Sequence, residues 1–342
     1  MQQVYAVGYL RSRPFDHFFT WGIPLVGGLS LLLVLLRPEF FVHVLLVDLS
    51  LLGYHHVIST YTRVNFSTDN ALQSRWLFIY TPLIVICLVS LTLMVWGPIV
   101  ITTLYLHWQW YHYTRQSEGI AKAYTFKSKT ELAGSHFFNR FVFYSVPIST
   151  FLVMSSRQHP EFLWSDVYTM PIPSVLADAL LFVSITTALY WLVRQLVGVH
   201  KGSLSPLVLT YFISHFCVYL FAYVIISDIN KGWLLINIWH NLQYIAFVWV
   251  CNVNQYADPT KGASKFRQWL CAPENWLFYF IICFLISHVF YSGTEMAINL
   301  FPVEIAASLM IIVYQSINFH HYIVDACIWK LRKKSVRAAV GV

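Results

Sequence analysis

The sequence predicts an all-α protein that crosses a membrane about ten times. Of its 342 residues, 58% are hydrophobic and only 11% are charged, whereas a soluble globular domain carries about 25% charged residues. The mean hydropathy is +0.59. At about 20 residues per span, the roughly 198 hydrophobic residues would supply about ten transmembrane helices. This composition excludes a soluble enzyme, a disordered chain and a disulfide-stapled scaffold.

Residues 1–342 read as one integral-membrane helical domain in which glycines and prolines separate ten apolar segments. The shortest separation is Gly97-Pro98, which predicts a tight hairpin between the third and fourth spans. We expect spans at about 18–36, 41–61, 76–96, 97–115, 140–156, 174–194, 206–227, 232–250, 275–293 and 303–329.

Basic residues divide unequally between the two sides of this topology. Of the 22 Lys and Arg residues, only three fall on the side opposite the N-terminus (Arg37, Arg157 and Lys231), and the other 19 share its side. Because Lys and Arg accumulate in cytoplasmic loops, we expect both termini in the cytoplasm. This distribution accounts for the net charge of +7 without a nucleic-acid partner. It predicts a multi-pass protein of the bacterial inner (cytoplasmic) membrane.

Two cytoplasmic loops are predicted to be long, at about 116–139 and 251–274. The first mixes basic and apolar residues, so we expect a solvated basic loop, with a helix lying along the membrane interface as the alternative. The N-terminal segment has no apolar core before its first arginines, and we therefore expect no removable signal peptide.

Eight histidines lie inside the predicted spans, and all map to the cytoplasmic half. Polar side chains in a bilayer are costly and usually face a bundle interior or a cavity. Histidines that only pack helices have no reason to share a leaflet, whereas imidazoles that bind one metal must converge to about 2 Å from it. We interpret the eight as a metal or haem site, with a proton relay or a polar substrate cavity as alternatives: His55, His56, His107, His112, His215, His240, His320 and His321.

Residues at helical spacing from two of these histidines suggest further roles. His240, Gln243 and Tyr244 share one helix face. Gln243 can orient an imidazole there, and Tyr244 can donate a proton or an electron. Asp325 follows His321 by one turn, so its carboxylate can bind a metal or hold a ligand imidazole. The alternative for Asp325 is an ordinary charge at the membrane interface.

Four more residues are weaker candidates. Arg63 and Arg115 each end a Tyr-Thr-Arg tripeptide, and they can either snorkel to the interface or bind an anionic headgroup or carboxylate. Asp48 lies about two turns before His55 on a similar face, and can support the site or carry protons. His136 can fold back from its loop as a ninth ligand.

This histidine pattern resembles the integral-membrane di-iron oxygenases, which include desaturases, lipid hydroxylases and alkane hydroxylases. That family has an HxxxH or HxxxxH motif followed by two HxxHH boxes. His107 and His112 match HxxxxH, and His55-His56 and His320-His321 supply the paired histidines. Neither pair has the preceding histidine of the box, and one pair comes before the HxxxxH motif. The resemblance implies two iron ions that activate O₂ against a hydrophobic substrate.

A second resemblance, to haem–copper oxidases, comes from the order of His240 and Tyr244 before His320-His321. It implies a membrane redox protein that binds haem or Cu. A proton or metal transporter is the third alternative, but the outer half of the spans is nearly bare of polar residues. We expect a metal-dependent oxidoreductase that hydroxylates or desaturates a membrane lipid or other hydrophobic substrate. Its partners would be O₂ and a cytoplasmic electron donor.

Overall fold

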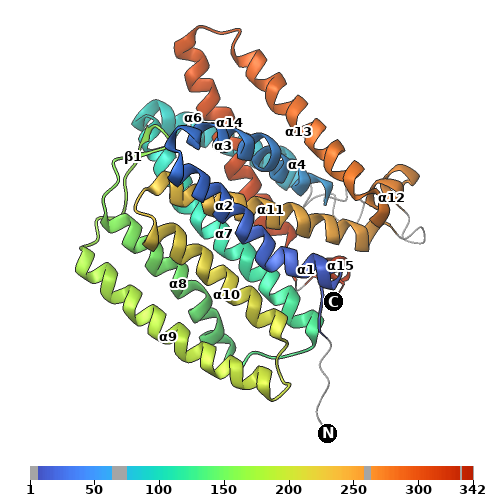
Figure 1. Cartoon of the computed structure of the whole chain (residues 1–342). Coiled ribbons are helices and arrows are strands. Elements are labelled where there is room, and N and C mark those ends of the chain that lie inside the picture. Colours follow the sequence, from blue (N-terminus) through green and yellow to red (C-terminus); the bar gives the residue numbers. More distant parts are fainter. Residues whose placement is uncertain (1–6, 64–74, 258–262, 332, 342) are drawn as a thin grey trace.

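The described chain is almost entirely helical in the computed structural model of the protein (Figure 1). The structure describes residues 7–63, 75–257, 263–331 and 333–341. The α-helices are α1 (Arg13–His17), α2 (Ile23–Leu36), α3 (Phe41–Val47), α4 (Tyr54–Thr62), α6 (Thr81–Trp96), α7 (Pro98–Ser128), α8 (His136–Ser156), α9 (Ser174–His200), α10 (Pro206–Leu220), α11 (Ile229–Tyr256), α12 (Lys265–Cys271), α13 (Trp276–Ile298), α14 (Val303–Ile328) and α15 (Lys334–Val340).

Short turns of π-helix or 3₁₀-helix adjoin several of these α-helices. Turns of π-helix cover Phe18–Gly22, Asp48–Gly53, Trp76–Tyr80 and Phe221–Ile225, and turns of 3₁₀-helix cover Pro38–Phe40 and Pro273–Asn275. The only strands in the described residues form a small antiparallel hairpin, β1 (Glu161–Phe162) and β2 (Ser165–Asp166).

Nine helical segments among the described residues are long and apolar enough to cross a membrane. They correspond to nine of the ten predicted spans, and the all-α class is confirmed. The remaining predicted span, 97–115, is the first part of α7. Alpha-helix α7 falls outside the set of nine because polar residues recur along it from His107 onward.

The turn between α6 and α7 is the hairpin that the sequence predicts. Gly97 adopts φ +73°, in the left-handed region where a side chain is disfavoured. Pro98 then occupies the first position of α7, where its missing N–H costs no helical hydrogen bond. The chain therefore reverses at this point without a longer loop.

The predicted loop at 116–139 is wrong in its first half, because α7 continues to Ser128. Two of the charges expected to keep this segment in solvent, Glu118 and Lys122, are paired instead. Glu118 accepts from Lys122 Nζ at 2.6 Å and from Arg140 Nε at 3.3 Å, and the Tyr144 hydroxyl donates to it at 2.8 Å. The helix can therefore stay packed in the bundle, and the connection to α8 shortens to residues 129–135.

The second predicted loop, 251–274, is also largely helical. Its start belongs to α11, which runs to Tyr256, and α12 forms over Lys265–Cys271. Residues 258–262, including Lys261, lie outside the described residues, as does Arg332 near the C-terminus.

Helix α11 is the centre of the bundle. Of its most apolar stretch, 89% is buried, compared with 11% for the segment Trp76–Trp96. It packs against α2, α4 and α15 (Figure 1). Where α11 begins, an added Cβ on Gly232 would lie 2.0 Å from the carbonyl oxygen of Ala222. A residue without a side chain is needed for the helices to approach this closely.

The two described ends of the chain lie at the same end of the bundle (Figure 1). Lys127 Nζ, near the end of α7, donates to the carbonyl of Leu10 at 2.8 Å. Asn254 Nδ2, near the end of α11, donates to the carbonyl of Ala339 in α15 at 3.0 Å. Polar contacts therefore hold both ends beside the last turns of α7 and α11.

The close approach at Gly232 gives a stability prediction. Gly232→Ala should destabilise the protein by about 1–3 kcal/mol, because the new methyl group would overlap a backbone carbonyl. Gly293→Ala in α13 is the matched control, since nothing lies within 4 Å of an added Cβ there. The measurement is the thermal unfolding midpoint in detergent. Equal midpoints for the two variants would contradict the packing described here.

Candidate metal centre

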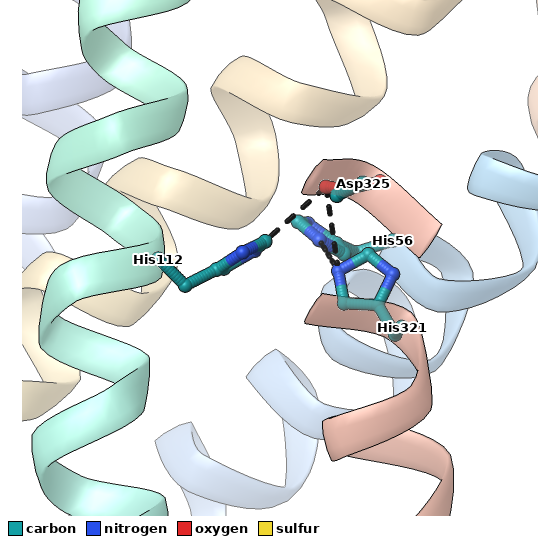
Figure 2. Close-up of side chains that lie close together, drawn as sticks. All are labelled: His56, His112, His321 and Asp325. Carbon is teal, nitrogen blue, oxygen red and sulfur yellow. Dashed lines mark hydrogen bonds and ion pairs between the residues drawn. The ribbon is translucent and has the colours of Figure 1, made fainter. Parts of the chain in front are cut away.

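Four buried side chains from three helices converge in the interior (Figure 2). His56 comes from α4, His112 from α7, and His321 and Asp325 from α14. One potential ligand atom from each lies within 4.8 Å of the others. Their exposed fractions are 3%, 6%, 2% and 5%, so all four are buried.

The donor atoms of this cluster face one another, and two of them have no hydrogen-bond partner in the described part of the chain. Nε2 of His56 and Nε2 of His321 are 2.8 Å apart. Asp325 Oδ2 lies 3.8 Å from His112 Nε2 and 3.7 Å from His321 Nε2. Among the described residues, His112 Nε2 and Asp325 Oδ2 have no hydrogen-bond partner. Buried polar atoms are normally paired, so these atoms fit a cation that they would share.

A hydrogen-bonded layer holds the carboxylate in this arrangement. The Tyr244 hydroxyl donates to Asp325 Oδ1 at 2.6 Å, and Trp329 Nε1 donates to the same hydroxyl at 3.1 Å. Oδ1 is therefore occupied and Oδ2 is left facing the imidazoles. Outer partners of this kind orient the ligands of metal sites.

The same layer sets the protonation of His321. Because the single Tyr244 hydroxyl proton goes to Asp325, Thr60 Oγ1 is the donor in its 2.7 Å contact with Tyr244, and it shares this proton with the His56 carbonyl at 3.3 Å. Thr60 then accepts from Nδ1–H of His321 at 3.1 Å. A proton on Nδ1 leaves the Nε2 lone pair of His321 directed into the cluster, where it accepts from His56 Nε2–H at 2.8 Å.

His240 of α11 borders the cluster. Its ring centroid lies 4.7 Å from that of His56 and 5.2 Å from that of His112. The Tyr113 ring covers its other side at 3.8 Å between centroids. His240 Nε2 is buried and has no partner among the described residues. It is placed to become a further donor, although it lies outside the group of four.

In each of the two His-His pairs, one histidine belongs to the cluster and the other contacts a neighbouring segment. His55 turns toward α13, where its ring meets Phe280 at 5.7 Å between centroids. His320 bonds the Leu77 carbonyl through Nε2 at 2.7 Å and the Tyr61 hydroxyl through Nδ1 at 3.0 Å. Adjacent residues on a helix diverge by about 100°, so only one member of each pair reaches the cluster.

The other two predicted histidine ligands also lie elsewhere. His107 bonds the Thr103 carbonyl of its own helix at 2.8 Å. His215 meets Ser117 Oγ at 3.0 Å and stacks on Phe143 at 4.1 Å between centroids. The expectation that eight histidines share one site is therefore corrected. His56, His112, His240 and His321 come together, and the other four lie outside this group, in contact with their own or neighbouring helices.

Gln243 does not orient an imidazole of the cluster, as its spacing from His240 suggested. Its Oε1 accepts from the Tyr211 hydroxyl of α10 at 3.3 Å, on a different side of α11 from the cluster. The face predicted for His240, Gln243 and Tyr244 is thus correct only for His240 and Tyr244. His136 begins α8 and lines a separate cavity, so it does not fold back onto the site.

The two predicted arginines differ in their surroundings. Arg63 NH1 donates to Gln255 Oε1 at 2.5 Å, and its guanidinium lies 4.9 Å from the Trp329 ring centroid. It therefore braces the tryptophan that supports Tyr244. Arg115 donates one hydrogen bond, at 3.2 Å, to the carbonyl of Ala326. Its position at a cavity is described below.

Asp48 is buried at 1% exposure within the π-helical turn that precedes α4. Asn237 Nδ2 donates to it at 2.5 Å and Asn241 Nδ2 at 3.3 Å. The Tyr113 hydroxyl bonds Asn237 Oδ1 and its ring covers His240. Asp48 therefore does not contact the cluster directly. It is connected to His240 through Asn237 and Tyr113.

Two cavities reach the cluster through different residues. A cavity of about 340 Å³ touches His112, Tyr244 and Asp325, and its other walls are mainly aromatic and aliphatic. A cavity of about 120 Å³ touches His56, His240 and His321, and its other walls include amide and hydroxyl side chains. The cluster therefore has access to one apolar space and one polar space.

Sequence reasoning missed Thr60 and Trp329, although a spacing signal exists for both. Thr60 follows His56 by four residues and Trp329 follows Asp325 by four residues. Each therefore shares a helix face with a member of the cluster.

Comparisons with protein-family models, curated proteins and solved structures found no match for this chain. What speaks for a metal is the donor set. Three imidazoles and one carboxylate suit first-row transition metals such as iron, zinc or copper. A buried group of this composition could bind a metal ion.

Metal analysis of variants tests the cluster. His321→Ala and Asp325→Asn should each weaken metal binding by at least about 100-fold, since loss of even an outer partner costs up to about that much. His320→Ala should keep its metal and lose only stability, because His320 bonds a backbone carbonyl. The measurement is elemental analysis of the purified protein after transition-metal reconstitution. Metal loss from His320→Ala with retention by His321→Ala would reverse the assignment.

Proposed function

We propose that this protein is a membrane-embedded, metal-dependent oxygenase that hydroxylates or desaturates a lipid-like hydrophobic substrate. The observation that carries the proposal is the position of the three-histidine, one-aspartate cluster at the wall of a largely apolar cavity of about 340 Å³. A buried metal beside an apolar binding space is what oxidation of an unactivated C–H bond needs.

The donor count favours one metal ion over the two irons that the family resemblance implies. Within the described residues, the candidate donors gather in a single group of four. Only His240 stands close enough to enlarge it. We therefore propose a mononuclear centre, most simply iron, bound by His56, His112, His321 and Asp325.

The reaction that follows from this assignment has a defined balance. For hydroxylation, a C–H bond of the substrate breaks and a C–O bond forms. One oxygen atom of O₂ enters the product, and the other leaves as water after taking up two electrons and two protons. The electrons would come from a cytoplasmic one-electron donor. A bound iron would supply open coordination positions for O₂.

The protein's own residues would position the ligands, provide a route for protons and form an apolar space for the substrate. Tyr244 fixes one oxygen of Asp325 and lines the apolar cavity, so its hydroxyl is placed between ligand and substrate space. The polar cavity beside His56 and His240 offers a route for protons on another side. The largely aromatic and aliphatic walls of the cavity favour an apolar substrate over water.

The alternatives fit the same residues less well. A haem would need room for its large ring next to the donors, whereas here four donor atoms lie within 4.8 Å of one another. A copper ion could use the same donors, and metal analysis separates it from iron. For a transporter, we would expect a polar path continuing beyond the cluster, but the larger cavity beside it is mainly apolar.

We also propose the ten-span topology with both termini in the cytoplasm. The nine apolar helices would leave the termini on opposite sides, because nine is odd. Counting α7 as a crossing makes ten and brings the ends together, which agrees with their position at one end of the bundle (Figure 1). The strong bias of basic residues supports the cytoplasmic side.

A labelling experiment tests the activity. Cells that express the protein should incorporate isotopically labelled O₂ into a lipid, or form a lipid with two fewer hydrogen atoms, as detected by mass spectrometry. Asp325→Asn should abolish the product, and Tyr244→Phe should lower it by about 10- to 100-fold. His107→Ala is the control, because His107 bonds only its own helix. An O₂-independent product, or full activity of Asp325→Asn, would refute an oxygenase at this site.

Reporter fusions test the topology. Green fluorescent protein should fluoresce when fused to the C-terminus, and alkaline phosphatase should be inactive there. The two reporters should give the opposite result when inserted at Pro302, between α13 and α14. Active phosphatase at the C-terminus would place that end outside the cytoplasm.

A further inference from the structure

The large cavity beside the cluster runs along one face of α7. Trp108, His112 and Gln116 follow one another at intervals of one turn, and all three line it. Arg115 lines the same cavity next to Gln116. Each helical residue rises about 1.5 Å, so the level of Gln116 is about 6 Å from that of His112.

The Gln116 side chain is an unexplained polar group in this cavity. Both its Nε2 and its Oε1 are buried, and neither has a hydrogen-bond partner among the described residues. Leaving a buried amide unpaired costs about 1–3 kcal/mol. No contact within the described fold accounts for a glutamine here, whereas a polar group on a bound molecule would.

Arg115 adds a positive charge to the lining of the same cavity. One of its hydrogen bonds goes to the Ala326 carbonyl in the last turn of α14, which anchors the side chain across the cavity. A guanidinium carries five N–H donors, so others remain for a ligand. Arginine beside an amide N–H₂ is a donor set suited to an oxyanion such as a carboxylate or phosphate.

The other walls of the cavity are apolar. Trp108 lies one turn before His112, on the side away from Gln116, and Ile323 of α14 faces the same space. Phe247 of α11 and Leu331 complete much of the lining. A hydrocarbon chain fits these walls, and a charged group does not.

We propose that this cavity binds a long-chain amphiphile by its oxyanion headgroup, with Arg115 and Gln116 as the headgroup site and the chain passing His112 toward Trp108. The headgroup then lies about one helical turn from the metal ligands. The carbon presented to the cluster is therefore a few bonds from the headgroup, and the end of the tail is far from it. The site of oxidation rests on the proposed oxygenase function, whereas the binding mode does not.

For hydroxylation the balance is that of the proposed reaction. The C–H bond near the headgroup breaks and a C–OH bond forms. The second oxygen atom of O₂ becomes water with two protons and two electrons from a one-electron donor. The headgroup takes no part in this exchange and only fixes which carbon reacts.

Binding of radiolabelled palmitate to the detergent-solubilised protein tests the headgroup site directly. Hexadecanol and hexadecane serve as uncharged competitors, and lysophosphatidic acid tests phosphate against carboxylate. We expect an anionic amphiphile to compete at least about 10-fold better than hexadecanol. Arg115→Gln should weaken palmitate binding by about 10-fold or more. Arg194→Gln is the control, since Arg194 is an exposed arginine near the end of α9, beside Tyr190.

Gln116→Leu tests whether the Gln116 amide binds the headgroup or has no role in ligand binding. If the amide binds the headgroup, this variant should lose palmitate affinity while its thermal unfolding midpoint stays equal or rises, because the unpaired amide is gone. An unchanged palmitate affinity in both Gln116→Leu and Arg115→Gln would overturn the headgroup site. Equal competition by hexadecane and palmitate would also overturn it.

The position of the oxidised carbon provides the second readout. Mass-spectrometric fragmentation of the product should place the new hydroxyl or double bond near the headgroup in the wild type. Oxidation at the tail end would contradict the binding direction while leaving the oxygenase proposal intact. Anion-selective binding without any oxidation would refute the oxygenase proposal and leave the headgroup site standing.

Discussion

The interaction on which the interior depends is the burial of the Asp325 carboxylate among imidazoles. A carboxylate removed from water costs several kcal/mol unless charge and hydrogen bonds compensate it. Tyr244 satisfies one oxygen, and the other faces His112 and His321. Thr60 links the same tyrosine to His321. The surrounding helices can pack tightly only if this group is satisfied, and a shared cation would do so.

Helix α7 contributes both to this cluster and to the apolar cavity beside it. One face carries His112 and Gln116 along the apolar cavity. Another face carries Glu118, whose carboxylate is paired with Lys122 and Arg140. Several of the polar residues that make α7 less apolar than the other long helices therefore lie in the interior, where they line the cavity or form ion pairs. A helix serving a site within a bundle does not need to be hydrophobic on every face.

Much of the fold could be predicted from local sequence patterns. The loop wrongly predicted over 116–128 depends on contacts that are not local. The spans, the Gly97 hairpin and the shared face of His321 and Asp325 depend on composition, backbone freedom and helical spacing, all of which are local. The false loop at 116–128 arose because a run of polar and charged residues was assigned to solvent. Its Glu118 is in fact paired with Arg140 on α8, 22 positions away in the sequence, and no local pattern reveals such a partner.

The sequence by itself determined that the chain is a bundle of apolar helices rich in internal histidines, because hydrophobicity and residue count do not depend on packing. It also determined that paired histidines must diverge around a helix. Only the tertiary structure decided that His56 and His321 turn inward, while the His55 ring packs against α13 and His320 bonds the carbonyl of Leu77. That choice depends on how each helix is rotated about its axis, and contacts with distant segments set this rotation.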